Sequence, residues 1–175
     1  MKKAVLGLGG NLGNRKENLS AALDALGRLP KTKVSRVSRC YETAPFQVFD
    51  AQPDYLNCCA EIETDLSPRT LLGACLGIEA AMGRVRLVEK GARVLDIDLL
   101  LYEGEASGDG ELTLPHPRML ERGFVLVPLS DLYPEGTALG LDFSRALTLV
   151  ERDGVRLCPE AEEPEKTERS SGGEG

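Results

Sequence analysis

Hydrophobic positions change their period several times along the chain, and each change predicts a different element. Residues 2–9 alternate loosely between polar and apolar side chains, which predicts a first strand. A glycine-rich turn at 9–13 follows, and apolar residues then recur every three or four positions up to Pro30, as in a helix. Asn14 is a good N-cap for this helix, and Glu17 stands three residues later, as in a capping box.

The next part of the chain places two strands before its helix. Residues 32–43 are rich in β-branched side chains and predict one strand, and residues 55–64 alternate strictly and predict another. A Ser-Pro pair at 67–68 is typical of a helix start, and a helical stripe of apolar residues then runs to Gly83. Residues 94–102 form a nearly continuous apolar strand. The order β-α-β-β-α-β predicts an α+β fold with a ferredoxin-like core.

The rest of the chain predicts an extension to this core. Residues 112–117 are expected to be extended, residues 117–132 partly helical, and residues 142–150 a short helix that Asp142 caps. Glu, Pro, Ser and Gly dominate residues 159–175, which offer little apolar surface to bury. We therefore expect one domain over residues 1–158, followed by an acidic disordered tail over 159–175.

Composition narrows the class of protein. The 175 residues carry a net charge of −7 with a pI near 4.9, which argues against binding to nucleic acid or anionic membranes. No apolar run approaches the roughly 18–20 residues of a membrane span, and the N-terminus lacks the apolar region of a signal peptide. The five cysteines include no CxxC motif and predict free thiols in a reducing compartment rather than a zinc site. We expect a cytoplasmic protein.

Two acidic residues, Asp96 and Asp98, interrupt the apolar strand at 94–102. Residues two positions apart on a strand share a face, so both carboxylates point together while their apolar neighbours point to the opposite layer. Two facing carboxylates repel each other unless a cation lies between them, and Mg²⁺ takes such oxygen ligands together with substrate phosphates. The alternative is a solvated edge strand with two incidental acids, which the apolar context disfavours.

A basic loop leads into this strand. Its four cations, against the single acid Glu89, are Arg84, Arg86, Lys90 and Arg93. Cations beside a metal-binding pair of carboxylates suit a polyphosphate, because arginine forks bind the oxygens that the metal leaves free. A surface loop of this kind can also be merely solvated.

Two further residues are candidates for the same site. Glu79 falls on the apolar face of the helix after 67–68, where a carboxylate needs a partner, so it either accepts a hydrogen bond from a ligand or reaches water at the edge of the stripe. His116, the only histidine, stands between two prolines that fix its backbone, as a pre-organised ligand contact requires. A lone histidine is otherwise most often structural. The turn at 9–13 is not a P-loop, because no Gly-Lys-Ser/Thr follows.

Six segments in this order resemble the 6-hydroxymethyl-7,8-dihydropterin pyrophosphokinase family of folate biosynthesis. The resemblance covers about residues 4–132, with weaker similarity to about residue 150. The segments are Gly9-Gly10-Asn11-Leu12-Gly13, Tyr41-Glu42-Thr43-Ala44-Pro45, Gln52-Pro53-Asp54-Tyr55-Leu56-Asn57, Gly83-Arg84-Val85-Arg86, Gly91-Ala92-Arg93-Val94-Leu95-Asp96-Ile97-Asp98 and Leu114-Pro115-His116-Pro117-Arg118-Met119. Each segment alone is weak, whereas all six in the family's order are specific.

The resemblance implies transfer of pyrophosphate from ATP to the hydroxymethyl group of a reduced pterin, with release of AMP, in tetrahydrofolate biosynthesis. It implies that Asp96 and Asp98 hold two Mg²⁺ ions and that Arg84 and Arg93 take part in catalysis. The positions that match the family's ATP site are Glu79, Arg84, Arg86, Lys90, Arg93, Thr113, His116 and Arg122. The positions that match its pterin site are Thr43, Ala44, Pro45, Phe46, Tyr55, Asn57 and Phe124.

The chain departs from the family's usual pattern at three places. Gly10 stands where a serine is frequent, Ala92 replaces a proline, and residues 87–90 lack the usual arginine and aromatic residue, leaving Lys90 as their only base. Two other functions remain open. Another Mg²⁺-dependent, nucleotide-using transferase would not need Asn57 or Phe124, and a non-enzymatic ferredoxin-like domain that binds a ligand would leave the aspartates and the basic loop unexplained together.

Overall fold

The computed structural model of the chain describes residues 1–45, 51–83, 91–150 and 154–159. Its main sheet has the strand order β10-β3-β4-β1-β5, and β2 also pairs with β4; every pairing is antiparallel. These strands are β1 (Lys2–Gly10), β2 (Thr32–Val37), β3 (Tyr41–Thr43), β4 (Tyr55–Thr64), β5 (Asp96–Tyr102) and β10 (Val155–Leu157).

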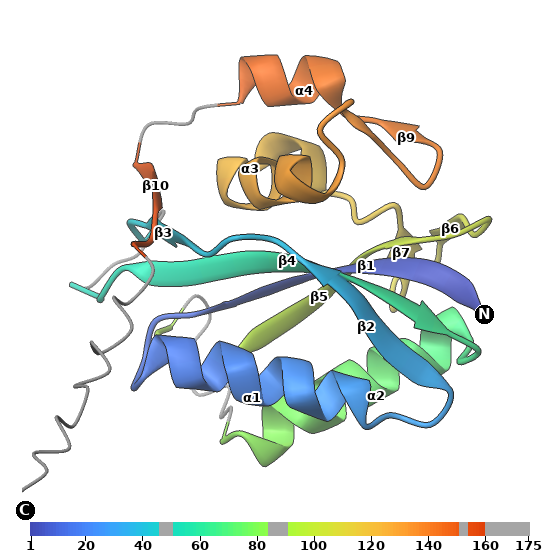
Figure 1. The fold of residues 1–175 in the computed structure, drawn as a ribbon, viewed down its shortest axis with the longest axis horizontal. Coiled ribbons are helices and arrows are strands. Elements are labelled where there is room, and N and C mark those ends of the chain that lie inside the picture. The colour runs from blue at the N-terminus through green and yellow to red at the C-terminus, as the bar shows by residue number, and fades with distance from the viewer. Residues whose placement is uncertain (46–50, 84–90, 151–153, 160–175) are drawn as a thin grey trace, which may run out of the picture.

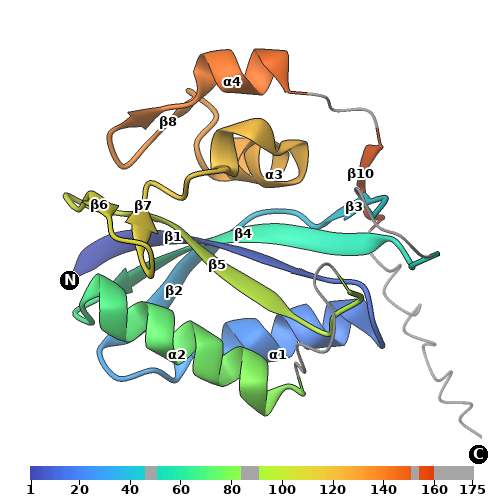
Figure 2. The same cartoon turned by 180° about the vertical axis from the view of Figure 1, so that it is seen from behind.

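Helices cover both faces of this sheet (Figures 1 and 2). α1 (Arg15–Gly27) and α2 (Pro68–Ala81) pack under one face. α3 (Gly123–Leu132) packs on the other face, and α4 (Ser144–Leu149) lies above α3. The remaining short elements are β6 (Ser107–Gly108), which pairs with β7 (Thr113–Leu114), the 3₁₀ turn η1 (Met119–Glu121), and β8 (Thr137–Ala138), which pairs with β9 (Leu141–Asp142). The predicted α+β class is confirmed.

Local sequence signals position the two lower helices. The Asn14 side chain accepts a hydrogen bond from the Glu17 backbone N–H at 3.2 Å, and the Ser67 hydroxyl accepts one from the Thr70 N–H at 3.2 Å. These two predicted caps are therefore confirmed. The predicted cap Asp142 is wrong: Phe143 is the N-cap of α4, and the Asp142 carboxylate instead accepts a hydrogen bond from the Ser144 N–H at 2.9 Å. α1 ends at Gly27 rather than close to Pro30. The backbone N–H groups of Arg28 and Leu29 donate to the carbonyls of Ala25 and Leu26, three residues back, so the chain leaves the α-helical pattern there.

Two hydrophobic cores lie on the two sides of the sheet. The lower core joins β1, β4 and β5 to the apolar stripes of α1 and α2. The upper core joins the opposite face of the same strands to α3. This second face of β4, which alternation marks as polar, is buried: Asn57, Cys59 and Glu61 are at most 6% exposed.

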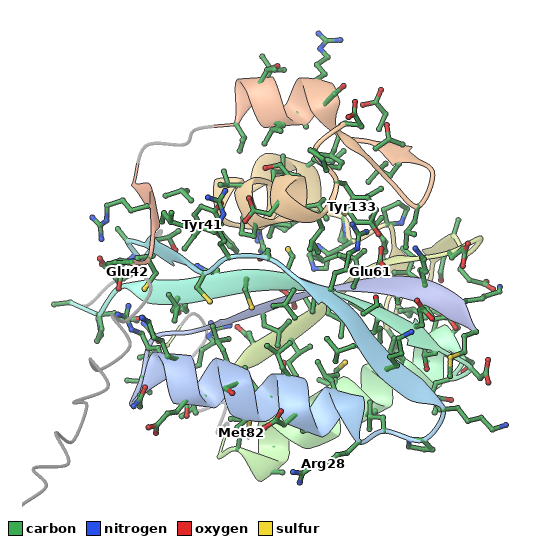
Figure 3. The ribbon with its side chains drawn as sticks, viewed as in Figure 1. Arg28, Tyr41, Glu42, Glu61, Met82 and Tyr133 are labelled. Carbon is green, nitrogen blue, oxygen red and sulfur yellow. The ribbon has the colours of Figure 1, made fainter. Side chains whose placement is uncertain are left out.

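The buried Glu61 fastens α3 to the sheet. Its Oε2 accepts a hydrogen bond from Arg36 Nη2 at 2.7 Å and another from the Tyr133 hydroxyl. Figure 3 shows Tyr133 and Glu61 in the layer between α3 and the sheet. Burial alone would raise the pKa of Glu61, but these hydrogen bonds lower it to about 2.

The single strand predicted over residues 32–43 is wrong. The chain forms β2 and β3 with a break at Ser38, whose backbone N–H donates to the Cys59 carbonyl at 2.9 Å while its hydroxyl accepts from the Cys59 N–H at 2.8 Å. The Ser38 hydroxyl therefore takes the place of a backbone carbonyl as the acceptor for the Cys59 N–H. The pairing register with β4 changes by one residue across this break.

Two other strands, β5 and β10, differ from the sequence prediction. β5 starts at Asp96 rather than Val94, because the Arg93 carbonyl accepts hydrogen bonds from the N–H groups of Asn11 and Leu12 instead of a strand partner. β10 was not predicted and pairs with β3 after α4. Across the described residues, no helix combines the length and the apolar character that crossing a membrane demands.

Candidate active site

A pocket of about 940 Å³ lies on the α3 side of the sheet. β1, β3, β4 and β5 line it from below, and η1, α3, α4 and β10 contribute to its walls. The predicted site residues that line it are Thr43, Ala44, Pro45, Tyr55, Asn57, Arg93, Asp96, Asp98, Arg122 and Phe124. The fold therefore gathers most of the described candidates from distant parts of the sequence into one cavity.

The two aspartates enter this pocket from the start of β5. Asp96 and Asp98 are partly exposed, while Ile97 between them is buried in the lower core, as strand alternation predicts. Arg93 Nη1 pairs with Asp96 Oδ2, and Arg122 Nη1 lies 3.9 Å from Asp98 Oδ2. Each carboxylate thus has an arginine beside it.

The electrostatics of the two arginines differ. Burial opposes the charge of Arg93, but the adjacent Asp96 carboxylate raises the pKa of Arg93 above its usual value. Burial lowers the pKa of Arg122, and the like charge of Arg118 acts in the same direction. Both remain cations at neutral pH, and both lie where a polyanion bound near the aspartates would meet them.

Glu79 supports the aspartate strand from below. Its side chain on α2 is 3% exposed, and Oε1 accepts a hydrogen bond from the Ile97 backbone N–H at 2.6 Å. Ile97 lies between the two aspartates on β5, the last strand of the main sheet, and its side chain is buried in the lower core. Glu79 does not line the pocket and orients β5 through this bond. The sequence predicted that Glu79 contacts either a ligand or water, and it did not predict a hydrogen bond to the β5 backbone.

Asn11 is a positioning residue that sequence reasoning missed. It is 2% exposed, and its Oδ1 accepts from the Arg93 backbone N–H at 2.8 Å while its own N–H donates to the Arg93 carbonyl at 2.9 Å. Its Nδ2 donates to Gln52 Oε1 at 3.1 Å and to the Pro53 carbonyl at 3.2 Å. Asn11 therefore links the segment before the aspartates to the segment before β4. Its place in the glycine-rich turn was the available signal.

Asn57 lies across β1 from Asp96, because Gly9 pairs with both of them. Its carboxamide is 6% exposed, and Nδ2 donates to the Thr43 hydroxyl at 2.9 Å. Its Oδ1 lies so close to Gly9 that a Cβ at position 9 would be only 2.3 Å away. The orientation of this amide therefore depends on a hydroxyl on β3 and on a missing side chain on β1.

Two aromatic residues line the same pocket. Phe124, half-buried at the start of α3, lies under the Arg122 guanidinium, which is 5.5 Å from the ring centroid. Tyr55 lines the pocket from β4, and burial raises the pKa of its hydroxyl, so it stays protonated at neutral pH. The pocket lining thus includes one phenyl ring, one phenol and one carboxamide.

Thr113 and His116 are not among the residues that line the pocket. His116 follows β7, and its backbone N–H donates to the Leu100 carbonyl at 2.8 Å. Burial lowers the pKa of His116, and the nearby Asp98 charge offsets this only in part, so the imidazole is neutral at pH 7. The other predicted residues lie outside the described residues; they are Phe46, Arg84, Arg86 and Lys90.

The C-terminal extension contributes side chains that the sequence did not point to. The added lining residues are Arg118, Leu120 and Glu121 around η1, Ala146, Leu149 and Val150 from and just after α4, and Gly154 and Val155 at β10. Arg118 stands in one of the six family segments but was given no role, and no spacing or motif marked the others. The places of Gly154 and Val155 depend on β10 pairing back onto β3.

The donor atoms at Asp96 and Asp98 fit a hard divalent cation. Two carboxylates on one face, partly exposed and facing a pocket, are the ligands that Mg²⁺ takes when phosphate oxygens complete its coordination. The described residues include no group of three or more side chains able to hold a metal ion by themselves. The pair therefore suits Mg²⁺ that arrives with a phosphorylated substrate.

Comparisons with known proteins agree with this arrangement. The model of the 7,8-dihydro-6-hydroxymethylpterin-pyrophosphokinase (HPPK) family matches residues 5–134. The 2-amino-4-hydroxy-6-hydroxymethyldihydropteridine pyrophosphokinase of Methylorubrum extorquens is 42% identical over 155 residues, covering 89% of this chain and 98% of that protein. The protein of the same name from Haemophilus influenzae is 45% identical over 132 residues, which is 75% of this chain and 82% of that one.

Solved structures agree at the level of the fold. The HPPK-DHPS protein of Plasmodium falciparum superposes with a TM-score of 0.62 at 16% identity, over 85% of this chain and 43% of that one. The chain thus spans less than half of that larger protein. The family model covers most of the chain and the Methylorubrum relative is matched almost end to end, so this chain belongs to the 7,8-dihydro-6-hydroxymethylpterin-pyrophosphokinase family.

Proposed function

We propose that this protein transfers the diphosphoryl group of ATP to the hydroxymethyl group of 6-hydroxymethyl-7,8-dihydropterin and releases AMP, as a Mg²⁺-dependent step of tetrahydrofolate biosynthesis. The observation that carries the proposal is that the Asp96–Asp98 pair lines the same cavity as Asn57 and Phe124. Transfer between two bound molecules needs their reacting atoms about 3–3.5 Å apart, which a shared pocket allows. The names of the relatives support the same reaction class.

The part of the pocket around Asn57 has groups that suit the pterin. A pterin is a flat ring with hydrogen-bond donors and acceptors along one edge, and a carboxamide offers both kinds of group. Thr43 fixes the Asn57 amide by accepting a hydrogen bond from Nδ2. Stacking of a base-like ring on an aromatic side chain contributes about 1–3 kcal/mol, and Phe124 is the residue we assign to this contact.

The part of the pocket around Asp96 and Asp98 has groups that suit the triphosphate. Asp96 and Asp98 would hold two Mg²⁺ ions, which when bound neutralise phosphate charge and orient the attacking and leaving oxygens. Arg93 and Arg122 already lie beside these carboxylates and would bind phosphate oxygens. Arg84, Arg86 and Lys90 are proposed to add cations from the basic loop, while Glu79 and Asn11 keep β5 and Arg93 in place.

The proposal extends to the setting of the reaction. We assign the protein to the cytoplasm as a monomer whose partners are ATP and the pterin. Its net charge of −7 supports the absence of nucleic-acid binding.

Product analysis tests the reaction. The protein is incubated with ATP, Mg²⁺ and the pterin alcohol, and the products are separated by chromatography and identified by ³¹P NMR. We expect AMP and a pterin diphosphate in equal amounts, no product with excess EDTA, and no AMP when the 6-methyl analogue replaces the alcohol. Formation of ADP would indicate a different nucleotide-using transferase, and ligand binding without turnover would indicate a binding domain.

A further inference from the structure

The proposed reaction uses none of the five cysteines, yet three of them form a row across neighbouring strands. The β3–β4 register, extended by one residue, places Cys40 opposite Cys58. On its other side, Cys40 accepts a backbone hydrogen bond from the Cys158 N–H at 2.9 Å, just after β10. Directly opposed residues of antiparallel strands project to the same face, and all three side chains pack in the lower core.

Cys40 and Cys58 are the pair best placed to react. Their backbone positions face each other next to the β3–β4 ladder, and both side chains lie on the lower-core face of the sheet. Opposed residues in an antiparallel ladder have Cα atoms about 4.5–5.5 Å apart, which lies inside the range of about 4.4–6.8 Å that disulfides span. Cys58 is 2% exposed and Cys40 is half-buried, so a reagent from solvent reaches Cys40 first.

The surroundings of Cys40 also favour its thiolate, which is the nucleophilic form. The neighbouring Cys58 thiol lowers the pKa of Cys40 to about 7; burial opposes this, and the charge of Lys16 on α1 adds to it. Burial instead raises the pKa of Cys59 and of Cys75 to about 12, so these two thiols stay protonated at neutral pH.

We infer that Cys40 is an oxidation site that reacts with hydroperoxides and forms a disulfide with Cys58. The Cys40 thiolate attacks the peroxide oxygen, an S–O bond forms as the O–O bond breaks, and one water or alcohol leaves. The Cys58 sulfur then attacks the resulting sulfenic acid. An S–S bond forms, the S–O bond breaks, and the hydroxide leaves as water with the Cys58 proton. The two thiols supply the two electrons that reduce the peroxide.

This modification would cross-link β3 to β4 one residue away from Asn57. It would hold the strand that carries Thr43 against the strand that carries Asn57. The chemical inference does not depend on the proposed function, because its test measures a covalent bond and not turnover.

Peptide mapping of the full chain tests the inference. The reduced protein is treated with equimolar hydrogen peroxide, the remaining thiols are alkylated in denaturant, and the chain is cleaved after glutamate. Glu42 separates Cys40 from Cys58, so a disulfide appears as two joined peptides that part on reduction. We expect Cys40 linked to Cys58 by fragmentation of the joined peptides, with Cys75 and Cys158 recovered in alkylated form.

Three variants sharpen the result. Cys58→Ala should lose the cross-link, while Cys59→Ala and Cys75→Ala, which remove other buried thiols, should keep it. If Cys58→Ala does not fold, the map of the wild-type protein decides alone. Recovery of Cys40 as an alkylated thiol, or its linkage to Cys59 or Cys158, would overturn the inference.

Discussion

At the scale of single residues, the candidate site depends on close backbone approach at two adjacent glycines of β1. A Cβ at Gly9 would lie 2.3 Å from Asn57 Oδ1, and a Cβ at Gly10 would lie 2.2 Å from the Val94 carbonyl oxygen. Real Cβ atoms do not approach other atoms so closely, so any side chain here displaces either the Asn57 amide or the start of the aspartate strand. The sequence indicated a turn at this motif, whereas the structure shows a packing requirement.

Gly9→Ala should therefore weaken pterin binding. A displaced or unpaired buried amide costs about 1–3 kcal/mol, so we expect the Kd of the pterin to rise by about 5- to 150-fold. Gly73→Ala on α2 is the matched control, because nothing lies within 4 Å of its Cβ position. Calorimetric titration with the pterin and a non-hydrolysable ATP analogue measures both variants. Equal Kd values for the two would show that Gly9 does not position Asn57.

The sequence predicted site residues well where they stand in a local motif, and poorly where only long-range contacts bring them to the site. Alternation on one apolar strand was enough to place Asp96 and Asp98 together. The role of Asn11 depends on bonds to segments about 40 and 80 residues away, at Gln52 and Arg93. Such long-range bonds leave no period or spacing in the sequence.

At the scale of elements, the starts of α1 and α2 were predictable, whereas the break between β2 and β3 was not. Asn14 and Ser67 act on their own helices within three residues, so their caps are visible locally. The break at Ser38 depends on a hydrogen bond to Cys59 across the sheet. Likewise, the polar positions of β4 gave no sign that α3 buries them, because burial is decided by a helix more than 60 residues further along the chain.

Glu61 should stabilise the contact between β4 and α3 in a pH-dependent way. The pKa of Glu61 is lowered from 4.5 to about 2 in the folded protein, so its contribution is present above pH 4.5 and is lost as the pH falls toward 2. Glu61→Gln leaves the Arg36 guanidinium, whose side chain is 45% exposed, without its charge partner, and losing a hydrogen bond to a charged group costs about 1.5–3 kcal/mol at pH 7.

Thermal unfolding of Glu61→Gln across this pH range measures the effect. We expect the difference in stability from wild type to be large at pH 7 and to shrink toward pH 2. Glu63→Gln is the control on the same strand, since its ion pair with Lys33 at 3.4 Å is partly exposed and contributes about 0–1 kcal/mol. A Glu61→Gln protein as stable at pH 7 as the Glu63→Gln control would contradict this role of Glu61.

At the scale of the whole molecule, the C-terminal extension completes the pocket. Val150 and Val155 line it, and β10 pairs with β3 next to Thr43. The sequence predicted an extension but not this return to the sheet, because a three-residue strand pairing with a distant edge has no pattern of its own.

Two truncations separate the extension from the tail. Removal of residues 151–175 deletes β10 and should raise the KM for the pterin several-fold, since part of the pocket wall is lost. Removal of residues 160–175 alone should leave the melting temperature and the KM unchanged, because the composition of that segment predicts little buried surface. Equal kinetics for both truncations would mean that β10 is not part of the pterin pocket, and a large fall in melting temperature for the shorter truncation would mean that the tail docks.

The central claim, that one pocket carries out Mg²⁺-dependent diphosphoryl transfer, is tested most directly by the rate of AMP release in aspartate variants. Asp96→Ala and Asp98→Ala should each lower kcat by about 10³-fold or more at saturating Mg²⁺, because the metal then has one carboxylate instead of two. Both should keep their circular dichroism spectra, since removing one of two facing charges relieves repulsion in the free protein. Asp24→Asn, at an exposed position on α1, is the control and should retain full activity. Near-wild-type AMP release by either alanine variant would contradict the account.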